Sequence, residues 1–171
     1  MFTLFQKKGD RTDPSNYGLI AITSLLSKVM ERVVNTQLLR YLEDRLLISD
    51  RQYGFRHRRS AVDVLVYLTH RCAEAIESRG EALAVNLDIA KAFDRVWHRF
   101  LLSKLPSYGA PEGLCYWVAS FLSERSVRIV VDGFSSYTFS INAGVPKGSV
   151  LSPTLVILHI NDLLQISNIR C

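Results

Sequence analysis

The sequence predicts a single α+β domain, because long segments with helical periodicity alternate with short segments that have the pattern of strands. Apolar residues recur at steps of three and four over residues 22–47 and again over residues 61–79, which is the spacing of amphipathic helices. Residues 83–88 and 125–131 instead carry large apolar side chains at every second position. This is the pattern of a strand, in which successive side chains point to opposite faces. With 171 residues, 48% of them hydrophobic, the chain is long enough to bury one core.

The composition argues against a membrane protein and against a zinc or disulfide framework. No apolar run approaches the ~20 residues that cross a bilayer, and lysines follow rather than precede the short apolar start, unlike a cleavable signal. The three cysteines, Cys72, Cys115 and Cys171, are far apart and form no C-x-x-C pair. We therefore expect an intracellular protein with no membrane partner.

The positive charge is concentrated in the first third of the chain. Residues 1–60 hold eleven Lys and Arg against six Asp and Glu, whereas residues 61–171 hold ten of each. A basic front end beside a neutral body suits a polyphosphate or nucleic-acid binder. The alternative is a solvated surface that only keeps the protein soluble.

In chain order, a turn-rich tip over residues 5–17 precedes the first helix, expected over residues 22–47. The tip is rich in Gly, Asp, Ser, Asn and Pro, and its basic side chains either close over phosphates or simply face solvent. Thr23 or Ser24 is placed to cap the helix. We expect its apolar stripe to be core: Leu25, Leu26, Val29, Met30, Val33, Val34, Leu38, Tyr41 and Leu42.

Residues 49–60 form a loop in which arginines and aromatic rings alternate. Its basic and aromatic members are Arg51, Tyr53, Phe55, Arg56, His57, Arg58 and Arg59. This mixture suits the backbone and stacked bases of a nucleic acid. It equally fits a surface loop that anchors two rings in the core.

A second helix is expected to begin after Ser60 and to end near Arg79. Ser60 and Asp63 have the spacing of a capping box, and Gly80 is a plausible stop. We expect one face of this helix to be buried, namely Val64, Leu65, Leu68, Cys72, Ala75 and Ile76.

The stretch over residues 84–94 reads A-V-N-L-D-I-A-K-A-F-D and places a carboxylate at the end of a predicted strand. Leu83, Val85 and Leu87 share one apolar face, and Asp88 ends the small, polar face opposite. Asp88 is either a metal ligand at the edge of a cleft or an ordinary aspartate that caps the next element.

The following residues predict two helices and a β-hairpin. Residues 90–105 should be helical until Pro106 breaks the helix, and Pro111 should begin another that reaches Leu122. Asp132-Gly133 is a hairpin signal between a strand over residues 125–131 and its return over residues 137–143.

Residues 144–153, G-V-P-K-G-S-V-L-S-P, predict a tight loop that leads into a helix. Ser152 and Pro153 have the residue types of a helix cap and a first helical position, and the helix should reach about residue 166. Lys147 and Gly148 lie just before this start, where free amides and the helix dipole favour phosphates. The alternative is that this loop and the helix start have only a structural role and bind no ligand.

Six segments together resemble the reverse transcriptase of non-LTR (LINE-type) retrotransposons, most closely the jockey-like kind. In order they are K-K-G-D-R-T-D-P-S-N-Y, S-K-V-M-E-R, Q-Y-G-F-R, L-D-I-A-K-A-F-D, A-G-V-P-K-G-S-V-L-S-P and I-N-D-L, spanning nearly the whole chain. The resemblance implies a right-hand polymerase fold. Residues 1–80 would be a fingers-like part and residues 81–171 a partial palm, a small antiparallel sheet backed by helices, with no thumb.

The resemblance also implies an activity, RNA-directed DNA polymerisation in a transposable element. A nucleotidyltransferase of this kind moves a nucleotide from a dNTP to a primer 3′-OH, using two Mg²⁺ ions, with Mn²⁺ as a substitute. Its partners would be an RNA template, a DNA primer and the dNTP, and its compartment would be the nucleus.

The resemblance assigns roles residue by residue. Asp88 matches the first catalytic, metal-binding aspartate, with the Ile89 carbonyl beside it. Asp94 belongs to the pattern but is expected to cap the next helix. The nucleotide-binding residues would be Phe93, Lys147, Gly148, Lys7 and Lys8. The template- and primer-binding residues would be Arg56, Arg58, Arg59 and Tyr53.

Three departures from the family pattern accompany these matches. The sequence is expected to be truncated before the Tyr/Phe-x-Asp-Asp turn that carries the second catalytic carboxylates. Gly18-Leu19 stands where the family has Arg-Pro, and Lys147 stands where it has Gln. One aspartate cannot hold two metal ions, so we expect these 171 residues to be inactive. The alternative is a catalytically dead relic of a mobile element, at most a weak nucleic-acid binder.

Overall fold

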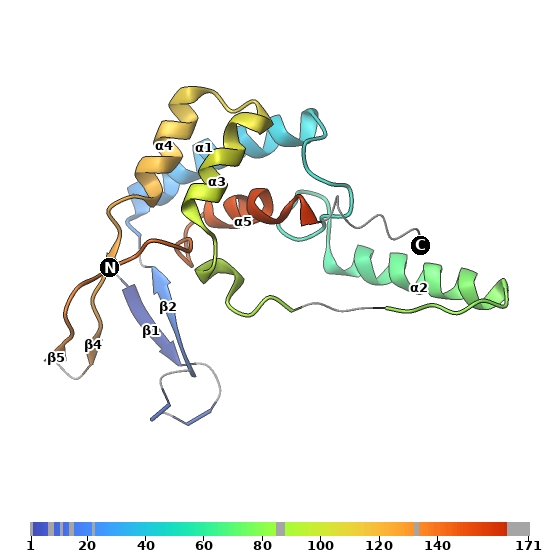
Figure 1. Ribbon diagram of the computed structural model, residues 1–171, viewed down its shortest axis with the longest axis horizontal. Coiled ribbons are helices and arrows are strands. Elements are labelled where there is room, and N and C mark those ends of the chain that lie inside the picture. The colour runs from blue at the N-terminus through green and yellow to red at the C-terminus, as the bar shows by residue number, and fades with distance from the viewer. Residues whose placement is uncertain are drawn as a thin grey trace.

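The computed structural model describes residues 2–6, 9–10, 12–13, 16–21, 23–84, 88–131 and 134–163 (Figure 1). Helices and short antiparallel strands are mixed along the chain, which confirms the predicted α+β class. In the described residues no helix is long and apolar enough to cross a membrane. The elements are β1 (Phe2–Gln6), β2 (Tyr17–Ala21), α1 (Leu25–Asp44), α2 (Ala61–Glu77), η2 (Ala92–Asp94), α3 (His98–Lys104), η3 (Leu105–Tyr108), α4 (Glu112–Leu122), β3 (Ser126–Val127), β4 (Val130–Val131), β5 (Phe134–Ser135), β6 (Phe139–Ser140) and α5 (Ser152–Ile160).

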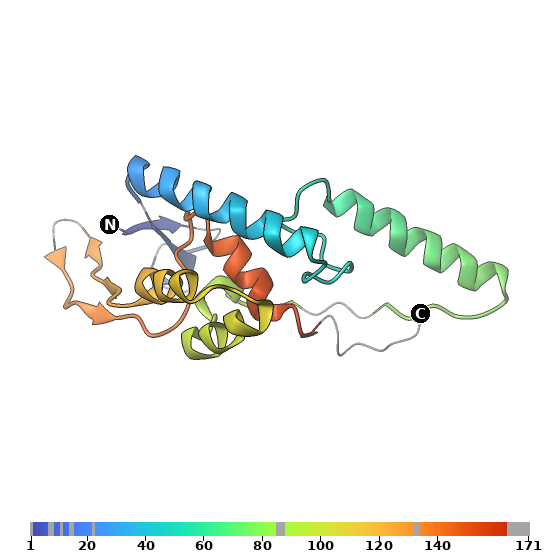
Figure 2. The same cartoon turned by 90° about the horizontal axis from the view of Figure 1, so that it is seen from above.

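Helix α5 is the centre of the core, with α1, α3 and α4 around it (Figures 1 and 2). Most of its residues are buried, as expected for a helix that is apolar on every side. It begins one residue earlier than predicted, because Leu151 is the N-cap and Ser152 the first helical residue. Residues 164–166 of the predicted helix lie outside the described residues. The buried apolar cluster comprises Leu38, Leu42, Ile48, Val96, Leu101, Leu105, Val118, Leu122, Val145, Leu151, Leu155, Val156, Ile157 and Leu158.

Helix α1 buries a different face from the one predicted. Ser24 caps it as expected, since its hydroxyl accepts a hydrogen bond from the Ser27 amide at 3.1 Å. Of the predicted stripe, only Leu38 and Leu42 are buried, together with Glu31. These buried positions follow one another at helical spacing, so the buried face is rotated away from the apolar stripe. Five members of that stripe are exposed: Leu25, Leu26, Val29, Met30 and Val33.

Helix α2 forms as predicted but buries none of its residues. The capping box is confirmed, because Ser60 Oγ accepts from the Asp63 amide and Asp63 Oδ2 accepts from the Ser60 amide. The helix extends away from the α5 core in both views (Figures 1 and 2). The expectation of a buried stripe was therefore wrong: Leu65, Leu68 and Ile76 are all exposed.

The described strands form three separate antiparallel pairs rather than one sheet. β1 pairs with β2, β3 with β6, and β4 with β5. The last two pairs belong to one hairpin, in which Val131 lies opposite Phe134. The sequence predicts the return strand over residues 137–143, whereas the described return arm begins at Phe134 and is divided into β5 and β6. The Asp132-Gly133 tip itself lies outside the described residues.

The segment from residue 81 to residue 97 differs most from the prediction. Residues 81–84 have no regular structure, and Leu83, expected on a core, is 91% exposed. Residues 85–87 of the predicted strand lie outside the described residues. The predicted helix over residues 90–105 is shortened to η2 and α3, and α3 gives way to η3 just before Pro106. Pro111 is the N-cap of α4 rather than its first residue.

Candidate functional site

The loop over residues 144–151 is held by segments that lie far away in the sequence. The Gly144 amide donates to the Val96 carbonyl and the Val145 amide to the Phe93 carbonyl, both at 2.7 Å. On the other side, the Ala21 amide at the end of β2 donates to the Lys147 carbonyl at 2.7 Å. The loop is thus fixed between β2 and η2.

Glu31 on α1 accepts hydrogen bonds from the end of this loop. Its side chain is buried, with the residue only 3% exposed. Its Oε2 accepts hydrogen bonds from Ser149 Oγ at 2.6 Å, from the Val150 amide at 2.7 Å and from the Leu151 amide at 3.3 Å. The protein's own carboxylate therefore occupies the start of α5, where backbone amides attract anions. The Val150 and Leu151 amides are therefore already bonded to Glu31, and a phosphate contact at Lys147 and Gly148 stays a prediction.

Lys147 forms an ion pair with Asp94 across the loop. Its Nζ lies 2.5 Å from Asp94 Oδ2, and both side chains remain partly exposed. The sequence predicted that Asp94 caps the next helix, and this was wrong. The N-cap of α3 is Trp97, which makes no side-chain capping bond. The pair explains how a lysine is accommodated here, because a nearby carboxylate balances its charge.

Gly148 occupies a backbone position that only glycine adopts without strain. Its φ is +99°, and a Cβ built on it would lie 2.8 Å from the Ala21 carbonyl oxygen. The loop can therefore approach β2 closely only because residue 148 has no side chain.

Phe93 is bonded to the loop through its carbonyl, which accepts from the Val145 amide, and its side chain is half-buried against the core. Its ring meets that of Phe55 edge to face, with the centroids 6.0 Å apart. The structure therefore brings Phe93, Lys147 and Gly148 into one region through the Phe93–Val145 and Lys147–Ala21 backbone bonds.

Asp88 and Ile89 lie on an exposed, irregular segment that leads into η2. Ile89 lines a cavity of about 320 Å³ with Arg95, His159 and Asp162. Burial lowers the pKa of His159, and the neighbouring Lys104 ammonium lowers it further. Across the part of the chain that the structure describes, no group of three His, Cys, Asp or Glu side chains gathers to hold a metal.

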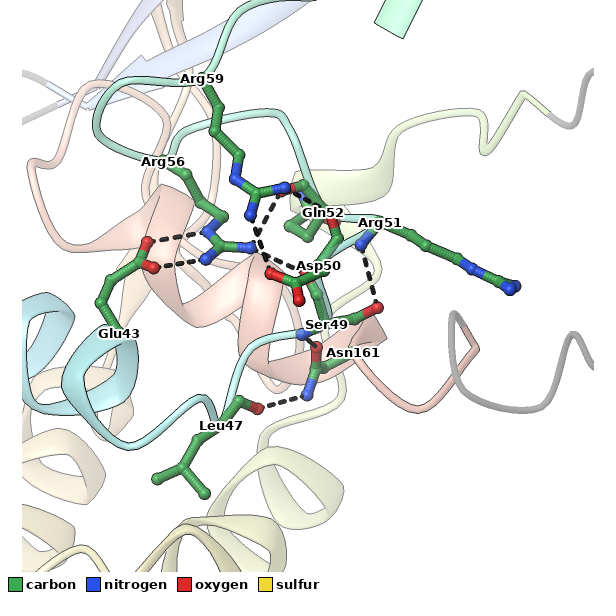
Figure 3. A network of polar contacts seen from close by, with 9 residues as sticks. All are labelled: Glu43, Leu47, Ser49, Asp50, Arg51, Gln52, Arg56, Arg59 and Asn161. Atoms are coloured by element: carbon green, nitrogen blue, oxygen red, sulfur yellow. Dashed lines mark hydrogen bonds and ion pairs between the residues drawn. The ribbon is translucent and has the colours of Figure 1, made fainter. Parts of the chain in front are cut away.

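The arginine-rich loop is built around a buried guanidinium, that of Arg56 (Figure 3). Arg56 Nε donates to Glu43 Oε1 at 2.7 Å, and Nη2 pairs with the other carboxylate oxygen. Its Nη1 donates to the Ser49 carbonyl at 2.8 Å and to the Gln52 carbonyl at 3.3 Å. The Arg56 hydrogen bond holds the pKa of Glu43 below its usual value. In this arrangement Arg56 shapes the loop and does not face solvent.

The other predicted template contacts lie on the outside of the same loop. Arg59 pairs with Asp50 at 2.8 Å, and its guanidinium carbon is 5.3 Å from the centre of the Tyr53 ring. Arg58 is exposed at a positive φ of 58°. Lys7 and Lys8, expected to reach the phosphates, lie outside the described residues.

Asn161 at the end of α5 is a buried polar residue that the sequence analysis did not single out. Its Oδ1 accepts from the Ser49 amide, and its Nδ2 donates to the Leu47 carbonyl, each at 2.9 Å (Figure 3). It therefore ties the arginine loop to the central helix. The motif I-N-D-L contains it, and a polar residue following the apolar run of α5 was the available signal.

Comparison with known proteins places these segments in one family. The family model described as "Reverse transcriptase (RNA-dependent DNA polymerase)" matches residues 5–170. The chain is 38% identical over 152 residues to the "RNA-directed DNA polymerase from mobile element jockey" of Drosophila melanogaster, covering 89% of this chain and 16% of that protein.

Two further relatives agree with this match. The "Probable RNA-directed DNA polymerase from transposon BS" of Drosophila melanogaster is 35% identical, over 88% of this chain and 16% of that protein. The "Retrovirus-related Pol polyprotein from type-1 retrotransposable element R2" of Popillia japonica is 30% identical, over 95% of this chain and 22% of that protein. The chain thus spans about one sixth of the length of the first curated relatives it matches.

Proposed function

The chain belongs to the reverse transcriptase (RNA-dependent DNA polymerase) family, and we propose that it supplies the deoxynucleotide-binding loop and one catalytic carboxylate of an RNA-directed DNA polymerase. In this reaction the primer 3′-hydroxyl attacks the innermost phosphate of a dNTP. A phosphodiester bond forms and pyrophosphate leaves. The RNA template, the DNA primer and the dNTP are the partners that this proposal requires.

The observation that carries the proposal is the fixed position of the loop that bears Lys147 and Gly148. The loop is bonded to β2, η2 and α1, three elements from different parts of the chain. A preorganised cation that is still partly exposed can contact a phosphate without further ordering of the backbone. Lys147 Nζ meets this requirement, since its ion pair with Asp94 fixes its position while both side chains remain partly exposed.

The described residues do not complete a two-metal site. Asp88 supplies one exposed carboxylate, whereas no group of three metal-ligating side chains occurs in the described ranges. Mg²⁺ prefers several oxygen ligands at nearly octahedral geometry. We therefore propose Asp88 and the Ile89 carbonyl as metal ligands by family resemblance alone.

The division into a fingers-like part, residues 1–80, and a partial palm, residues 81–171, belongs to the same proposal. In it, Lys7 and Lys8 reach the triphosphate, and Arg58, Arg59 and Tyr53 meet the template. Arg56 acts through its bonds with Glu43 and the loop carbonyls, which set the path of the backbone that carries these side chains.

Nucleotide binding by Gly148→Ala tests the proposed loop. The new Cβ would meet the Ala21 carbonyl at 2.8 Å, and the positive φ would be strained for alanine. We expect the affinity for dTTP, measured by isothermal titration in Mg²⁺, to fall at least tenfold while the circular dichroism stays that of a folded protein.

Gly113→Ala is the matched control for this substitution. Gly113 lies near the start of α4, and a Cβ there meets nothing within 4 Å. This variant should bind dTTP like the wild type and gain about 0.5–1 kcal/mol of stability. Equal dTTP affinity in the two variants would contradict the nucleotide-loop proposal, and no binding by the wild type would favour a relic without function.

A further inference from the structure

The hairpin from Ser126 to Ser140 carries three aromatic side chains that are largely exposed. Phe134 is 82% exposed, Tyr137 89% and Phe139 56%. The hairpin projects from the helical core in both views (Figures 1 and 2). Exposed rings on one arm are costly in water, and they offer flat faces on which nucleic-acid bases stack.

A cavity lies at the base of the same hairpin. It measures about 230 Å³ and is lined by Arg125, Lys147, Asp94 and the backbone around Gly144. The Gly144 carbonyl accepts from Arg125 Nη1 at 2.8 Å and is 2.7 Å from His98 Nε2. The loop that carries Lys147 therefore forms one wall of this cavity, and the hairpin forms the other.

Arg125 gives the cavity a net positive charge. Lys147 and Asp94 neutralise each other, whereas Arg125 has no carboxylate partner in the described part of the chain. Burial lowers the pKa of its guanidinium, because a desolvated cation without a counter-charge is costly. An anion in the cavity would compensate it, and a guanidinium has five N–H donors of which one bonds Gly144.

We propose that this hairpin is a binding surface for single-stranded nucleic acid, in which Arg125 holds a backbone phosphate and the rings of Phe134, Tyr137 and Phe139 stack on bases. The occupant is a polynucleotide because the rings lie at successively greater distances from Arg125. Phe139 is opposite Val127 and so lies near Arg125, whereas Phe134 is opposite Val131 at the far end of the hairpin. Residues 126–131 span on the order of 20 Å at the usual strand rise. A strand of several nucleotides reaches from Arg125 to Phe134 and a single nucleotide does not.

The proposed hairpin surface extends the proposed function. It depends on that function only because both require the chain to bind nucleic acid. The residues are distinct from those assigned to the nucleotide loop and to the arginine loop, apart from Lys147 at the cavity rim. Binding can therefore be tested at the hairpin without altering Gly148, Asp88 or Arg58.

The test is fluorescence anisotropy with labelled single-stranded RNA and DNA 20-mers, titrated with the full 171-residue chain at several salt concentrations. Two changes are made on the hairpin, Arg125→Gln and the double change Phe134→Ala with Tyr137→Ala. Arg125→Lys keeps the charge. Two matched controls lie away from the hairpin (Figure 1). Tyr67→Ala is within α2, and Arg79→Gln is just after its end.

We expect the double aromatic change to weaken oligonucleotide binding by about tenfold or more, because stacking on each base is lost. Arg125→Gln should reduce the slope of log affinity against log salt by about 0.7, the value for one phosphate contact on a single strand. Arg125→Lys should retain the wild-type slope, and both α2 controls should bind like the wild type.

Three results would overturn the inference. In the first, the hairpin variants lose no more affinity than the α2 controls while the wild type binds RNA, which leaves the proposed function standing. In the second, Arg125→Gln weakens binding of dTTP but not of the oligonucleotides, which assigns the cavity to a free triphosphate. In the third, the wild type binds no nucleic acid, which removes both proposals. If Arg125→Gln does not fold, the exposed aromatic pair still decides the question.

Discussion

Replacing Glu43 by alanine is expected to lower the free energy of unfolding by about 3–5 kcal/mol. The change leaves Arg56 charged and nearly buried, with its side chain only 4% exposed. A buried charge that has lost its partner keeps its desolvation cost without the compensating attraction. The two carbonyl bonds from Ser49 and Gln52 remain but cannot replace a carboxylate held by two donors. Urea unfolding followed by circular dichroism measures the loss.

Asp50→Ala is the matched control, because Asp50 pairs with the next arginine of the same loop. The Asp50 side chain is 81% exposed in its pair with Arg59, and exposed ion pairs contribute about 0–1 kcal/mol. If both variants lost the same small amount of stability, the Glu43–Arg56 pair would not be what holds the arginine-rich loop.

The Glu43–Arg56 pair also predicts a pH dependence of stability. Arg56 lowers the pKa of Glu43 below its usual value of 4.5, so the folded state binds the Glu43 proton less readily than the unfolded state. The stabilising contribution is therefore complete above the unfolded pKa and is lost as the pH falls through the folded one. The unfolding free energy of Glu43→Ala should accordingly change less than that of the wild type below about pH 4.5.

Replacing Glu31 by alanine is expected to cost about 3 kcal/mol and to loosen the loop that carries Lys147. The change leaves Ser149 Oγ and the Val150 and Leu151 amides without the buried carboxylate that accepts from them. Buried donors without an acceptor carry their full desolvation cost. Urea unfolding measures the stability, and hydrogen exchange of the Val150 and Leu151 amides reports on the loop.

Glu31→Gln separates charge from hydrogen bonding at this position. Glutamine keeps one acceptor oxygen, so it should recover roughly half of the lost stability and slow the exchange of the two amides. Glu77→Ala, at the exposed end of α2, should change stability by less than about 0.5 kcal/mol. Unchanged amide exchange in Glu31→Ala would show that the loop does not depend on this carboxylate.

The sequence predicted well those features that depend on local residue chemistry. The Ser24 cap and the Ser60–Asp63 capping box are each determined by a few neighbouring side chains. The resemblance to a reverse transcriptase is likewise confirmed, because its six segments lie within the range that the family model matches.

The sequence predicted poorly which faces of the helices are buried. On α1, Glu31 and Asn35 follow the helical spacing of Leu38 and Leu42, and they bond Ser149 and Thr154 more than 100 residues away. A count of apolar positions cannot identify that face, because two of its members are polar and have distant partners. The same limit applies to Asp94, whose partner Lys147 comes from another segment.

Primer extension on an RNA template with dNTPs and Mg²⁺, performed with the 171-residue chain and with Asp88→Ala, tests the central claim most directly. In the residues that the structure describes, no group of three metal-ligating side chains gathers around Asp88, whereas two metal ions need more than one carboxylate. We therefore predict salt-sensitive binding of the primed template and no extension by either protein. Extension by the wild type that disappears with Asp88→Ala would contradict this prediction, because the chain would then catalyse without a second set of carboxylates.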